Sequence, residues 1–476
     1  MIFTSFSYLL FLPVAYLAFY FGTDRWRWFV LLIASYGFYA SFKAPYLLAV
    51  LLMVTGISYV CGLCITTYED EVIRKRWLWI GSLACLSILA IMKYLPFLES
   101  KANSILGFNS AQSSACISIG VSYFTFQAIS YMADIYLEIE EEPERHIGRF
   151  ALYMAFFPKL LQGPIERAGT LLPQLKQPYQ FDYDAMRSGM LLFTWGLFKK
   201  TVVADRFALY ADQVYNNVHN YTGISLIIGT YAYALQIYFD FSAYTDMARG
   251  TGRMFGINLS ENFNSPYLAT SVADFWRRWH ISFSRWILDY IFRPLQMKWR
   301  QYGRCGTVVA LIITFIISGI WHGPAWGFVI WGLLHGVYLA SSVCYSPYQK
   351  KLHMWLGIKK NYCLKLWQII FTFNIVSIAW IFFRANTLGD AYYFICNLFT
   401  GSKGLIDDLI LSQGKLELLI LLLTCIFYII ISRLIPFDNS RYINNIYIRW
   451  LVYLSIVMNI LVFTVAEEGK FIYMQF

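Results

Sequence analysis

The stretch 305–349, CGTVVALIITFIISGIWHGPAWGFVIWGLLHGVYLASSVCYSPYQ, decides the fold. Its 45 residues include no Asp, Glu, Lys or Arg. Because about 20 apolar residues cross a bilayer as one helix, this length is enough for two crossings. In its middle, Gly323 and Pro324 follow His322, and glycine commonly ends a helix while proline cannot continue one. The stretch therefore predicts two membrane helices with a break at His322.

His322 is an ionisable side chain at this expected helix break. Non-helical backbone persists at membrane depth only where protein or a water-filled cavity satisfies its polar groups. An imidazole at such a position is therefore a candidate functional residue. The alternative is a hydrogen-bonded packing histidine, and the stretch by itself is compatible with both interpretations.

The composition indicates an all-α polytopic membrane protein. Of the 476 residues, 58% are hydrophobic and 14% are charged, whereas soluble globular chains have about 25% charged residues. The net charge of +10 comes from basic residues that cluster between apolar runs, so it requires no nucleic acid. No second cysteine pair or histidine cluster completes a metal site with Cys61 and Cys64, so we expect no metal.

The apolar segments predict about 11–13 membrane helices, including broken or re-entrant ones. The longest polar connections, 96–113 and 385–414, are shorter than an independent domain, so we expect one membrane domain over 1–476 and no soluble domain. The expected segments are 3–21, 27–42, 46–66, 77–95 and 114–136, then the weaker or broken 148–163, 186–203 and 222–248, and finally 306–322, 325–345, 366–384, 415–435 and 447–466.

The basic connections predict the orientation of the chain. They lie at 25–27, 74–76, 277–304 and 350–360, and they share one side if the first five spans alternate from an external N-terminus. This orientation places 68–76 and 277–304 in the cytoplasm and both termini on the external side.

The segment 271–290, SVADFWRRWHISFSRWILDY, predicts an amphipathic helix. At 100° per residue its aromatic side chains share one face, and its aspartates and arginines share the opposite face. Such a helix is typical of the membrane interface. His280 lies at the border of the apolar face, where it is either a second functional histidine or part of an anchor helix.

These side chains limit the chemistry of the chain. An imidazole is the usual general base for a hydroxyl or thiol near neutral pH, and arginines can hold phosphates. The sequence has no nucleophile elbow, metal-ligand spacing, phosphate-binding glycine loop or dinucleotide fingerprint. The remaining set suits acyl transfer from an anionic cytoplasmic carrier, and it also suits a proton-coupled transporter.

Five motifs follow one another along nearly the whole chain. They are GVSYFTFQAISY at 120–131; FFPKLLQGPIER at 156–167; DFSAYTDMA at 240–248 with ENFN at 261–264 and WRRWHIS at 276–282; GIWHG at 319–323 with WGLLHG at 331–336; and FIYMQF at 471–476. Together they resemble the membrane-bound O-acyltransferases, specifically the bacterial branch that serves alginate and peptidoglycan O-acetylation. The core motifs lie roughly within 115–345. The likeness to the D-alanine-exporting relatives of teichoic acid synthesis is weaker.

The resemblance implies a helical body around a central chamber, with His322 near its middle. His322 matches the catalytic histidine of the family, and His280 matches its second, cytoplasm-side functional position. Arg277 and Arg278 are candidates for the phosphates of coenzyme A, or else are topology signals. Further candidates for the chamber are Asp240, Asp246, Gln162, His335 and Trp321. Asp240 and Asp246 could instead cap a helix break or be solvated, and His335 could be a packing residue.

The resemblance also implies a reaction and its partners. Acetyl-coenzyme A would be the donor substrate on the cytoplasmic side of a bacterial inner membrane, with no permanently bound cofactor. Without an extramembrane domain, the chain would need a separate periplasmic or cell-surface acetyltransferase of the SGNH (serine-hydrolase-like) type to reach an exported polysaccharide. One alternative is a transporter or flippase of a glycan or acyl carrier. Others are transfer of a D-alanyl or longer acyl group, or direct transfer to a lipid-linked glycan.

Overall fold

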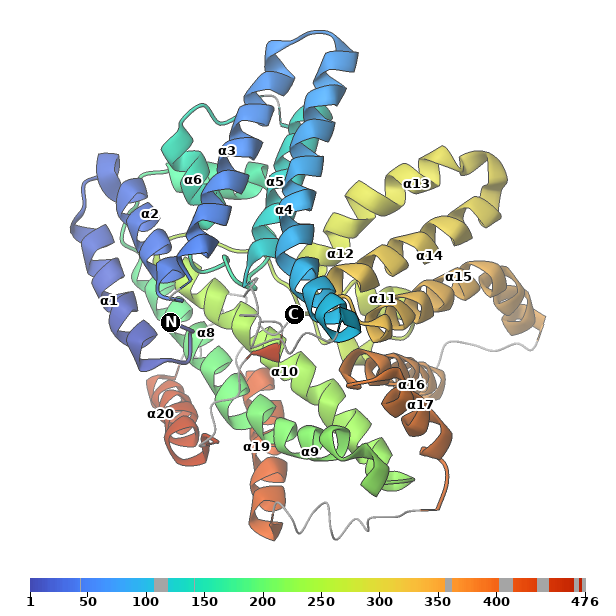
Figure 1. Ribbon diagram of the computed structural model, residues 1–476. Coiled ribbons are helices and arrows are strands. Elements are labelled where there is room, and N and C mark those ends of the chain that lie inside the picture. Colours follow the sequence, from blue (N-terminus) through green and yellow to red (C-terminus); the bar gives the residue numbers. More distant parts are fainter. Residues whose placement is uncertain are drawn as a thin grey trace. The chain divides into compact units, whose positions relative to one another are not determined.

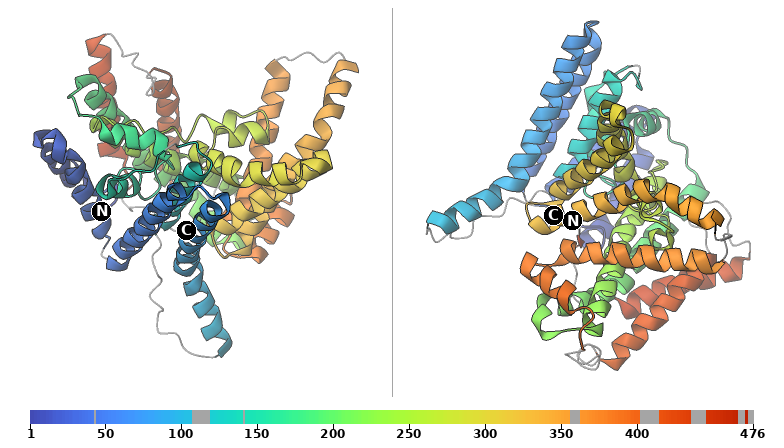
Figure 2. Two further views of the ribbon diagram at one scale, coloured as in Figure 1. Left: turned by 90° about the horizontal axis from the view of Figure 1, so that it is seen from above. Right: turned by 90° about the vertical axis from the view of Figure 1, so that its right-hand side faces the viewer.

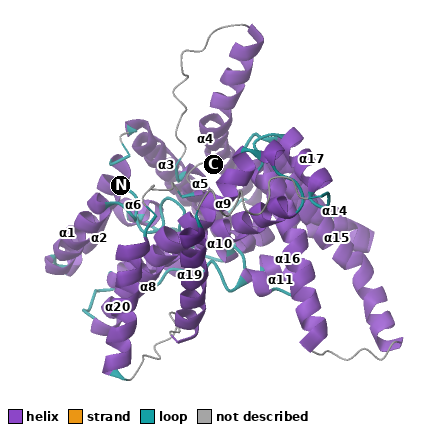
Figure 3. Ribbon diagram, turned by 90° about the horizontal axis from the view of Figure 1, so that it is seen from below, coloured by secondary structure: helices purple, strands orange, loops and turns teal. Residues whose placement is uncertain are grey.

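The computed structural model describes residues 1–42, 44–106, 119–140, 142–355, 362–401, 414–434, 445–465 and 471–472. These residues are predominantly helical and contain no strand, only an isolated bridge between Phe263 and Trp279 (Figure 3). The chain divides into two compact units, which are described separately. Unit 1 comprises Met1–Leu197, Ala243–Glu261 and Lys470–Phe476, and unit 2 comprises Phe198–Ser242 and Asn262–Gly469.

Unit 1 contains the helices of the N-terminal part of the chain (Figure 1). Helices α3, α4 and α5 pack against one another, and α2 packs against α6. Helix α4 is longer than the predicted segment 77–95: its 36 residues correspond to about 54 Å, well beyond the ~30 Å of a hydrocarbon core. The helices are α1 (Phe6–Phe21), α2 (Asp24–Ala40), α3 (Pro45–Thr67), α4 (Glu71–Leu106), α5 (Val121–Tyr136), α6 (Ile147–Ala155), α7 (Ala168–Lys176) and most of α8 (Tyr183–Phe198).

Unit 2 contains the segments that carry the predicted histidines. Helix α10 (Ile224–Met254) begins in unit 2 and continues into unit 1 without interruption. The other helices are α9 (Asp205–Asn216), α11 (Val272–Trp276), α12 (Ile281–Ile287), α13 (Arg293–Lys298), α14 (Gly303–His322), α15 (Trp326–Trp355), α16 (Tyr362–Arg384), α17 (Leu388–Asn397), α19 (Lys415–Leu434) and α20 (Ile446–Phe463). Short π-helical turns η1 (Lys199–Ala204) and η4 (Leu288–Phe292), and 3₁₀ turns η2 (Val218–Asn220), η3 (Pro266–Leu268) and η5 (Arg300–Tyr302), join them.

Helices α14 and α15 lie side by side because glycines remove side chains from their contact (Figures 1 and 2). A Cβ atom on Gly319 would meet the backbone of Phe328, and one on Gly332 would meet the backbone of Phe315. Small residues allow this close approach of helix backbones inside membranes. The pairing holds the end of α14 against the beginning of α15, and thereby fixes the position of His322.

Among the described residues, eight helices are long and apolar enough to cross a membrane, and α1 is apolar but shorter. This confirms the predicted class, an all-α polytopic membrane protein. The eight candidate spans are Pro45–Thr67, Glu71–Leu95, Ile224–Met254, Arg300–His322, Trp326–Gln349, Tyr362–Arg384, Lys415–Arg433 and Ile446–Phe463.

In the middle of the chain, one alternative that the sequence left open is wrong, and one segment that it indicated as weak or broken is only partly helical. The suggested helix break near Asp240 and Asp246 is absent, because α10 runs through both positions. The expected segment 148–163 is helical only in α6, and the following residues 156–167 are non-helical. Nearly all of them are nevertheless buried within unit 1, where protein replaces water around the backbone.

The prediction of one continuous amphipathic helix over 271–290 is also wrong. The structure divides this segment into α11, α12 and η4, with His280 between the first two helices. The aromatic side chains are buried, as the pattern predicted. They pack against protein instead of the membrane interface: Trp276 contacts Phe315, and Trp279 contacts Trp380. The segment is therefore packed on α14 and α16 through its apolar face.

Candidate active site

His322 is the last residue of α14, and Gly323 follows as the helix cap. Helix α15 begins at Trp326, shortly after this cap, so the predicted break at His322 is confirmed. The side chain is buried, with its residue only 4% exposed. Its ring lies 4.5 Å from the ring of Trp321 and 4.9 Å from the rings of both Trp331 and Phe383, between centroids. The imidazole is thus enclosed by aromatic surfaces.

His280 occupies a strained backbone position between α11 and α12. Its φ of 42° and ψ of 57° lie in the left-handed region, which non-glycine residues rarely adopt and which costs about 1–3 kcal/mol. Asn262 stabilises the turn: its carbonyl accepts from the Ile281 N–H, and its Oδ1 accepts from the Ser282 N–H, both at 3.0 Å. Strain at a buried histidine indicates that the surrounding structure imposes this conformation.

The turn at His280 explains why the ENFN motif accompanies the WRRWHIS motif. Besides the Asn262 contacts, the Asn264 N–H donates to the Arg278 carbonyl, and Phe263 forms the isolated bridge with Trp279. Sequence reasoning recognised both motifs but gave Asn262 no role. The place of Asn262 in the ENFN motif was the signal that the sequence offered.

The three predicted histidines share one aromatic cluster in unit 2. The ring of Phe283 lies 5.0 Å from His280 and 6.5 Å from His322, between centroids. The ring of Trp331 lies 4.9 Å from His322 and 5.0 Å from His335. We call this set, His280, Phe283, His322, Trp331 and His335, the histidine cluster. The sequence did not single out the two connecting aromatic residues.

His335 is held by a hydrogen bond from a tryptophan. The indole Nε1–H of Trp276 donates to Nδ1 of His335 at 3.2 Å, and the histidine is fully buried. Because the indole nitrogen can only donate, Nδ1 must be the acceptor, and a neutral His335 carries its proton on Nε2. Within the part of the chain that the structure describes, Nε2 has no hydrogen-bond partner.

Burial decides the charge state of His280, which lies outside the candidate spans. Desolvation lowers the pKa of its imidazole to about 3, because the charged form would lose its hydration inside the protein. Phe241 and Phe283 pack against the ring, at centroid distances of 4.7 and 5.0 Å. At neutral pH the side chain is therefore a neutral imidazole, which can both donate and accept a hydrogen bond.

The two predicted arginines, Arg277 and Arg278, differ in how closely they pair with Asp274. Nε of Arg278 donates to Asp274 at 3.0 Å, so this guanidinium is already paired. Arg277 is 74% exposed in its side chain and reaches the same carboxylate only at 4.0 Å. It also lines an apolar cavity of about 460 Å³ in unit 2.

Asp240 is committed to a buried ion pair. Its carboxylate lies 2.6 Å from Nζ of Lys200, which also lies 2.8 Å from Asp205. Burial lowers the pKa of Lys200, but the attraction of the two carboxylates outweighs it, so that the pKa is raised and the ammonium stays charged. Sequence reasoning missed Lys200, although adjacent lysines in the apolar run 190–204 were a usable signal.

Two predicted chamber residues belong to unit 1. Gln162 is buried in the non-helical segment 156–167, and Asp246 lies 3.8 Å from Arg249 in an ion pair. Nearby in sequence, the buried Lys159 donates to Oε1 of Gln127. Burial lowers the pKa of Lys159 to about 7, and Glu166 opposes this effect. These residues form a polar interior within unit 1.

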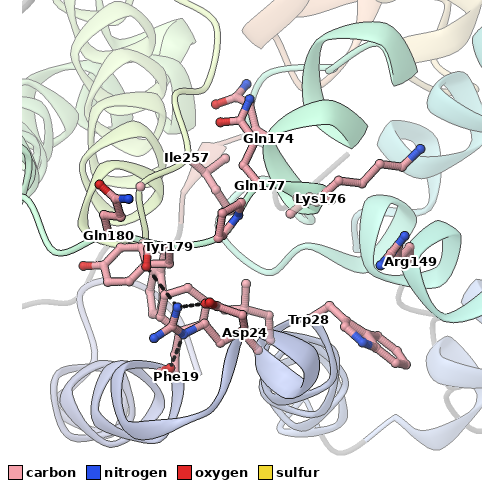
Figure 4. A pocket seen from close by; sticks show the side chains of 16 residues that line it. Phe19, Asp24, Trp28, Arg149, Gln174, Lys176, Gln177, Tyr179, Gln180 and Ile257 are labelled. Carbon is pink, nitrogen blue, oxygen red and sulfur yellow. Dashed lines mark hydrogen bonds and ion pairs between the residues drawn. The ribbon is translucent and has the colours of Figure 1, made fainter.

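Unit 1 also contains a polar pocket of about 210 Å³ between α1, α2 and the segment 174–180 (Figure 4). Arg149 and Lys176 lie on one side, and Tyr179 and Gln180 on the other. Arg27 in its wall is bound to Asp24 and to the carbonyl of Tyr179. The described residues include no group of three His, Cys, Asp or Glu side chains that could hold a metal.

The fold and the site together define a multi-pass helical membrane protein with buried histidines at an interrupted helix. The membrane-bound O-acyltransferase family model matches residues 144–384, which include all members of the histidine cluster. The chain belongs to this family, and it is therefore an O-acyltransferase.

The chain is similar to several bacterial relatives. It is 34% identical to a peptidoglycan O-acetyltransferase from Helicobacter pylori over 76% of this chain and 71% of the relative. It is 34% identical to a probable alginate O-acetylase, AlgI, from Azotobacter vinelandii, over 91% of this chain and 84% of the relative. A teichoic acid D-alanyltransferase from Bacillus subtilis is more distant, at 27% identity over 56% of this chain and 69% of the relative.

Proposed function

We propose that the protein transfers an acetyl group from cytoplasmic acetyl-coenzyme A across the membrane, for O-acetylation of an exported cell-wall or extracellular polysaccharide. The observation that carries the proposal is His322, a buried imidazole at the interrupted membrane helix of an O-acyltransferase. The names of the relatives at 34% identity, a peptidoglycan O-acetyltransferase and an alginate O-acetylase, support acetyl as the transferred group.

In the proposed reaction His322 acts as the general base. It accepts the proton of the acceptor hydroxyl while the hydroxyl oxygen attacks the thioester carbonyl carbon. The carbon–sulfur bond breaks, and the leaving coenzyme A sulfur takes the proton from the imidazolium, so His322 returns to its neutral form. In a two-step variant, a ring nitrogen of His322 first attacks the thioester carbon, the carbon–sulfur bond breaks, and the coenzyme A sulfur leaves with the proton of the other ring nitrogen. The acceptor hydroxyl then attacks the acetyl carbon, the bond from carbon to the ring nitrogen breaks, and the hydroxyl proton returns to the ring. A positioned general base contributes about 10²–10⁴-fold to such a reaction.

The residues around His322 support acyl transfer rather than hydrolysis. Trp321, Trp331 and Phe383 surround the imidazole, and the burial of His322 limits the access of water to it. His280 is proposed to meet the donor on the cytoplasmic side, where its neutral imidazole can hold the thioester or the leaving sulfur by a hydrogen bond. Asp240 then has a structural role, because its carboxylate neutralises Lys200.

The donor is proposed to act as a substrate, with no permanently bound cofactor. Contact of Arg277 and Arg278 with the coenzyme A phosphates stays a prediction. The exposed Arg277 is the better placed of the two, because Arg278 is already paired with Asp274.

The acceptor side is proposed to involve a second protein. The described residues form helices and their connections, and the proposed acceptor is a polymer outside the membrane. A periplasmic or cell-surface acetyltransferase of the SGNH type would therefore supply the accepting hydroxyl and pass the acetyl group to the polysaccharide. This arrangement requires the bacterial inner membrane, with acetyl-coenzyme A on one side and the partner on the other.

A second candidate donor group is D-alanyl, which the similarity to the teichoic acid D-alanyltransferase favours. The lower identity and coverage of that relative give the D-alanyl group less support than the acetyl group. Competition between the two donors decides the point: D-alanyl-thioester should leave the acetyl-coenzyme A turnover unaffected if acetyl is the natural group.

The test uses the detergent-purified protein with radiolabelled acetyl-coenzyme A and a membrane extract that supplies acceptor and partner. Coenzyme A release and label on the protein are measured for the wild type, His322→Ala and His322→Gln. We expect both variants to lose release by about 10²–10⁴-fold. Label that stays on the wild type after denaturation would favour the acetyl-histidine route.

A matched control is His219→Gln, which changes an exposed histidine that contacts Asp390 and Tyr393. It should retain wild-type release. Equal release by the wild type and His322→Ala, in the presence of the extract, would refute the assignment of His322.

A further inference from the structure

An apolar cavity of about 460 Å³ lies in unit 2 between the segment 273–292 and helices α14 and α15. Its volume falls within the range of small-molecule sites, about 300–1,000 Å³. Trp276, Leu311, Phe315 and Leu339 supply much of its apolar wall. His322 is not among the residues that line this cavity, so the cavity is distinct from the candidate active site.

Two arginines line the same cavity. Arg277 and Arg285 are both exposed, so their guanidinium groups remain accessible to a ligand. Arg285 forms no ion pair with any residue that the structure describes. Arg277 reaches only Asp274, at 4.0 Å, and that carboxylate is held more closely by Arg278. Two available guanidinium groups beside an apolar cavity suit a ligand with a phosphate and a hydrocarbon chain.

The surrounding chain indicates where such a ligand would come from. Helices α14 and α15 are candidate membrane spans, and the arginines belong to the basic stretch 277–304 that joins them to the rest of unit 2. Clustered arginines next to membrane helices attract anionic lipids of the cytoplasmic leaflet. A lipid in that leaflet has its phosphate at the depth of the basic stretch and its acyl chain at the depth of the helices.

We propose that this cavity binds an anionic phospholipid, with an acyl chain against Trp276 and Phe315 and the phosphate on Arg285 and Arg277. The site goes beyond the proposed function, and it replaces the predicted contact of Arg277 with the coenzyme A phosphates by a contact with a lipid phosphate. Its occupant would also touch the histidine cluster indirectly. Trp276, which lines the cavity, donates to His335, and the Trp331 ring contacts both His335 and His322.

The test measures binding of dioleoyl phosphatidylglycerol to the delipidated full-length protein by native mass spectrometry, with dioleoyl phosphatidylcholine as the neutral comparison. The wild type should bind the anionic lipid more tightly than the neutral one. Arg277→Gln combined with Arg285→Gln should weaken it by about thirtyfold, from the usual attraction of two basic side chains to anionic lipid. The control is Arg293→Gln, an arginine of the same stretch that pairs with Asp289 and does not line the cavity.

A second pair of variants tests the apolar part of the site. Leu311→Trp fills the cavity from α14 and should reduce binding of phosphatidylglycerol, whereas Val309→Trp, at an exposed position of the same helix outside the cavity, should not. Equal binding of both lipids with no effect of the arginine variants would overturn the proposal, because it would mean a general apolar contact. Displacement of the lipid by free coenzyme A, with coenzyme A affinity lost in Arg285→Gln, would overturn it in favour of the acyl donor.

Discussion

The histidine cluster contains imidazoles with different surroundings, and these surroundings assign them different tasks. His322 ends a helix among aromatic rings, whereas His335 lies within α15 and accepts a hydrogen bond from Trp276. A fully buried side chain with a fixed acceptor role is typical of a packing residue. For His335 the structure thus favours the packing interpretation that the sequence left open.

The first prediction concerns this hydrogen bond. Trp276→Phe and His335→Phe should each lower the free energy of unfolding in detergent, since each leaves a buried polar atom of its partner unsatisfied, at about 1–3 kcal/mol. The double variant should lower the free energy of unfolding by less than the sum of the two single variants, and the difference, the coupling energy, should be about 1 kcal/mol. Thermal or denaturant unfolding of the four proteins measures the cycle. Strictly additive effects would show that the two side chains do not interact.

The second prediction concerns the charge state of His280. Its pKa is about 3 in the folded protein and about 6.5 in the unfolded chain, so the unfolded chain binds more protons between these values. Stability should therefore fall as the pH falls from 6.5 towards 3, and this group should contribute no pH dependence above 6.5. His280→Asn should flatten that slope, because asparagine tolerates the left-handed backbone but does not titrate in this range.

Unfolding midpoints measured between pH 5 and pH 7.5 test this difference. The wild type, measured over the same pH range, is the comparison. An unchanged slope in His280→Asn would mean that His280 reaches solvent in the protein.

At the scale of elements, the pairing of α14 with α15 positions His322. Their contact depends on glycines, and a Cβ at Gly319 would meet the backbone of Phe328. Backbone atoms cannot move aside as a flexible side chain can, so the helices would have to separate.

The third prediction follows from this contact. Gly319→Ala should lower the unfolding midpoint by several degrees and reduce acyl transfer together with it, since the end of α14 would shift. Gly37→Ala is the matched control, because a Cβ added at this position of α2 would meet nothing within 4 Å and alanine is the better helix former by about 1 kcal/mol. Wild-type stability and activity in Gly319→Ala would show that the two helices are not in close contact.

Apolar length and helix breakers were sufficient to predict most long elements. A helix needs about 20 apolar residues to cross the hydrocarbon core, and the sequence contains runs of about this length. These runs predicted the pair α14 and α15, with its break at His322, and the later spans α16, α19 and α20. The short helices α7, α9 and α17 were not predicted, because each has too few residues for a span and depends on its neighbours. In the segment 271–290 the period of 3.6 identified the buried face, but it could not show that His280 adopts a left-handed conformation.

Parts of the candidate site could not be predicted because they depend on contacts distant in sequence. Asn262 stabilises the turn at His280 from another segment of the chain, and Lys200 and Asp240 are 40 positions apart. The spacing of apolar residues along the chain gives no information about contacts between such distant residues. The histidines were predicted individually, but their common aromatic cluster required the folded chain.

For the whole molecule, the fourth prediction concerns orientation in the membrane. The basic connections predict 277–304 in the cytoplasm and the connection 385–414 outside. Cys396 is exposed within 385–414, and Cys305 is exposed near the start of the candidate span Arg300–His322, directly after 277–304. In variants that retain one cysteine each, a membrane-impermeant maleimide on intact spheroplasts should label Cys396 and spare Cys305, and permeabilised cells should label both. The opposite pattern would invert the orientation and place the proposed acetyl donor on the wrong side.

The division of the chain into units has a consequence for biosynthesis. Unit 1 gathers residues from three separate parts of the sequence, and Phe471 is buried with its ring 5.3 Å from that of Tyr244. A ribosome completes nearly all of unit 2 before it delivers Phe471. The segment that carries Tyr244 must therefore wait in the bilayer without its contact to Phe471 while the rest of the chain is translated and inserted.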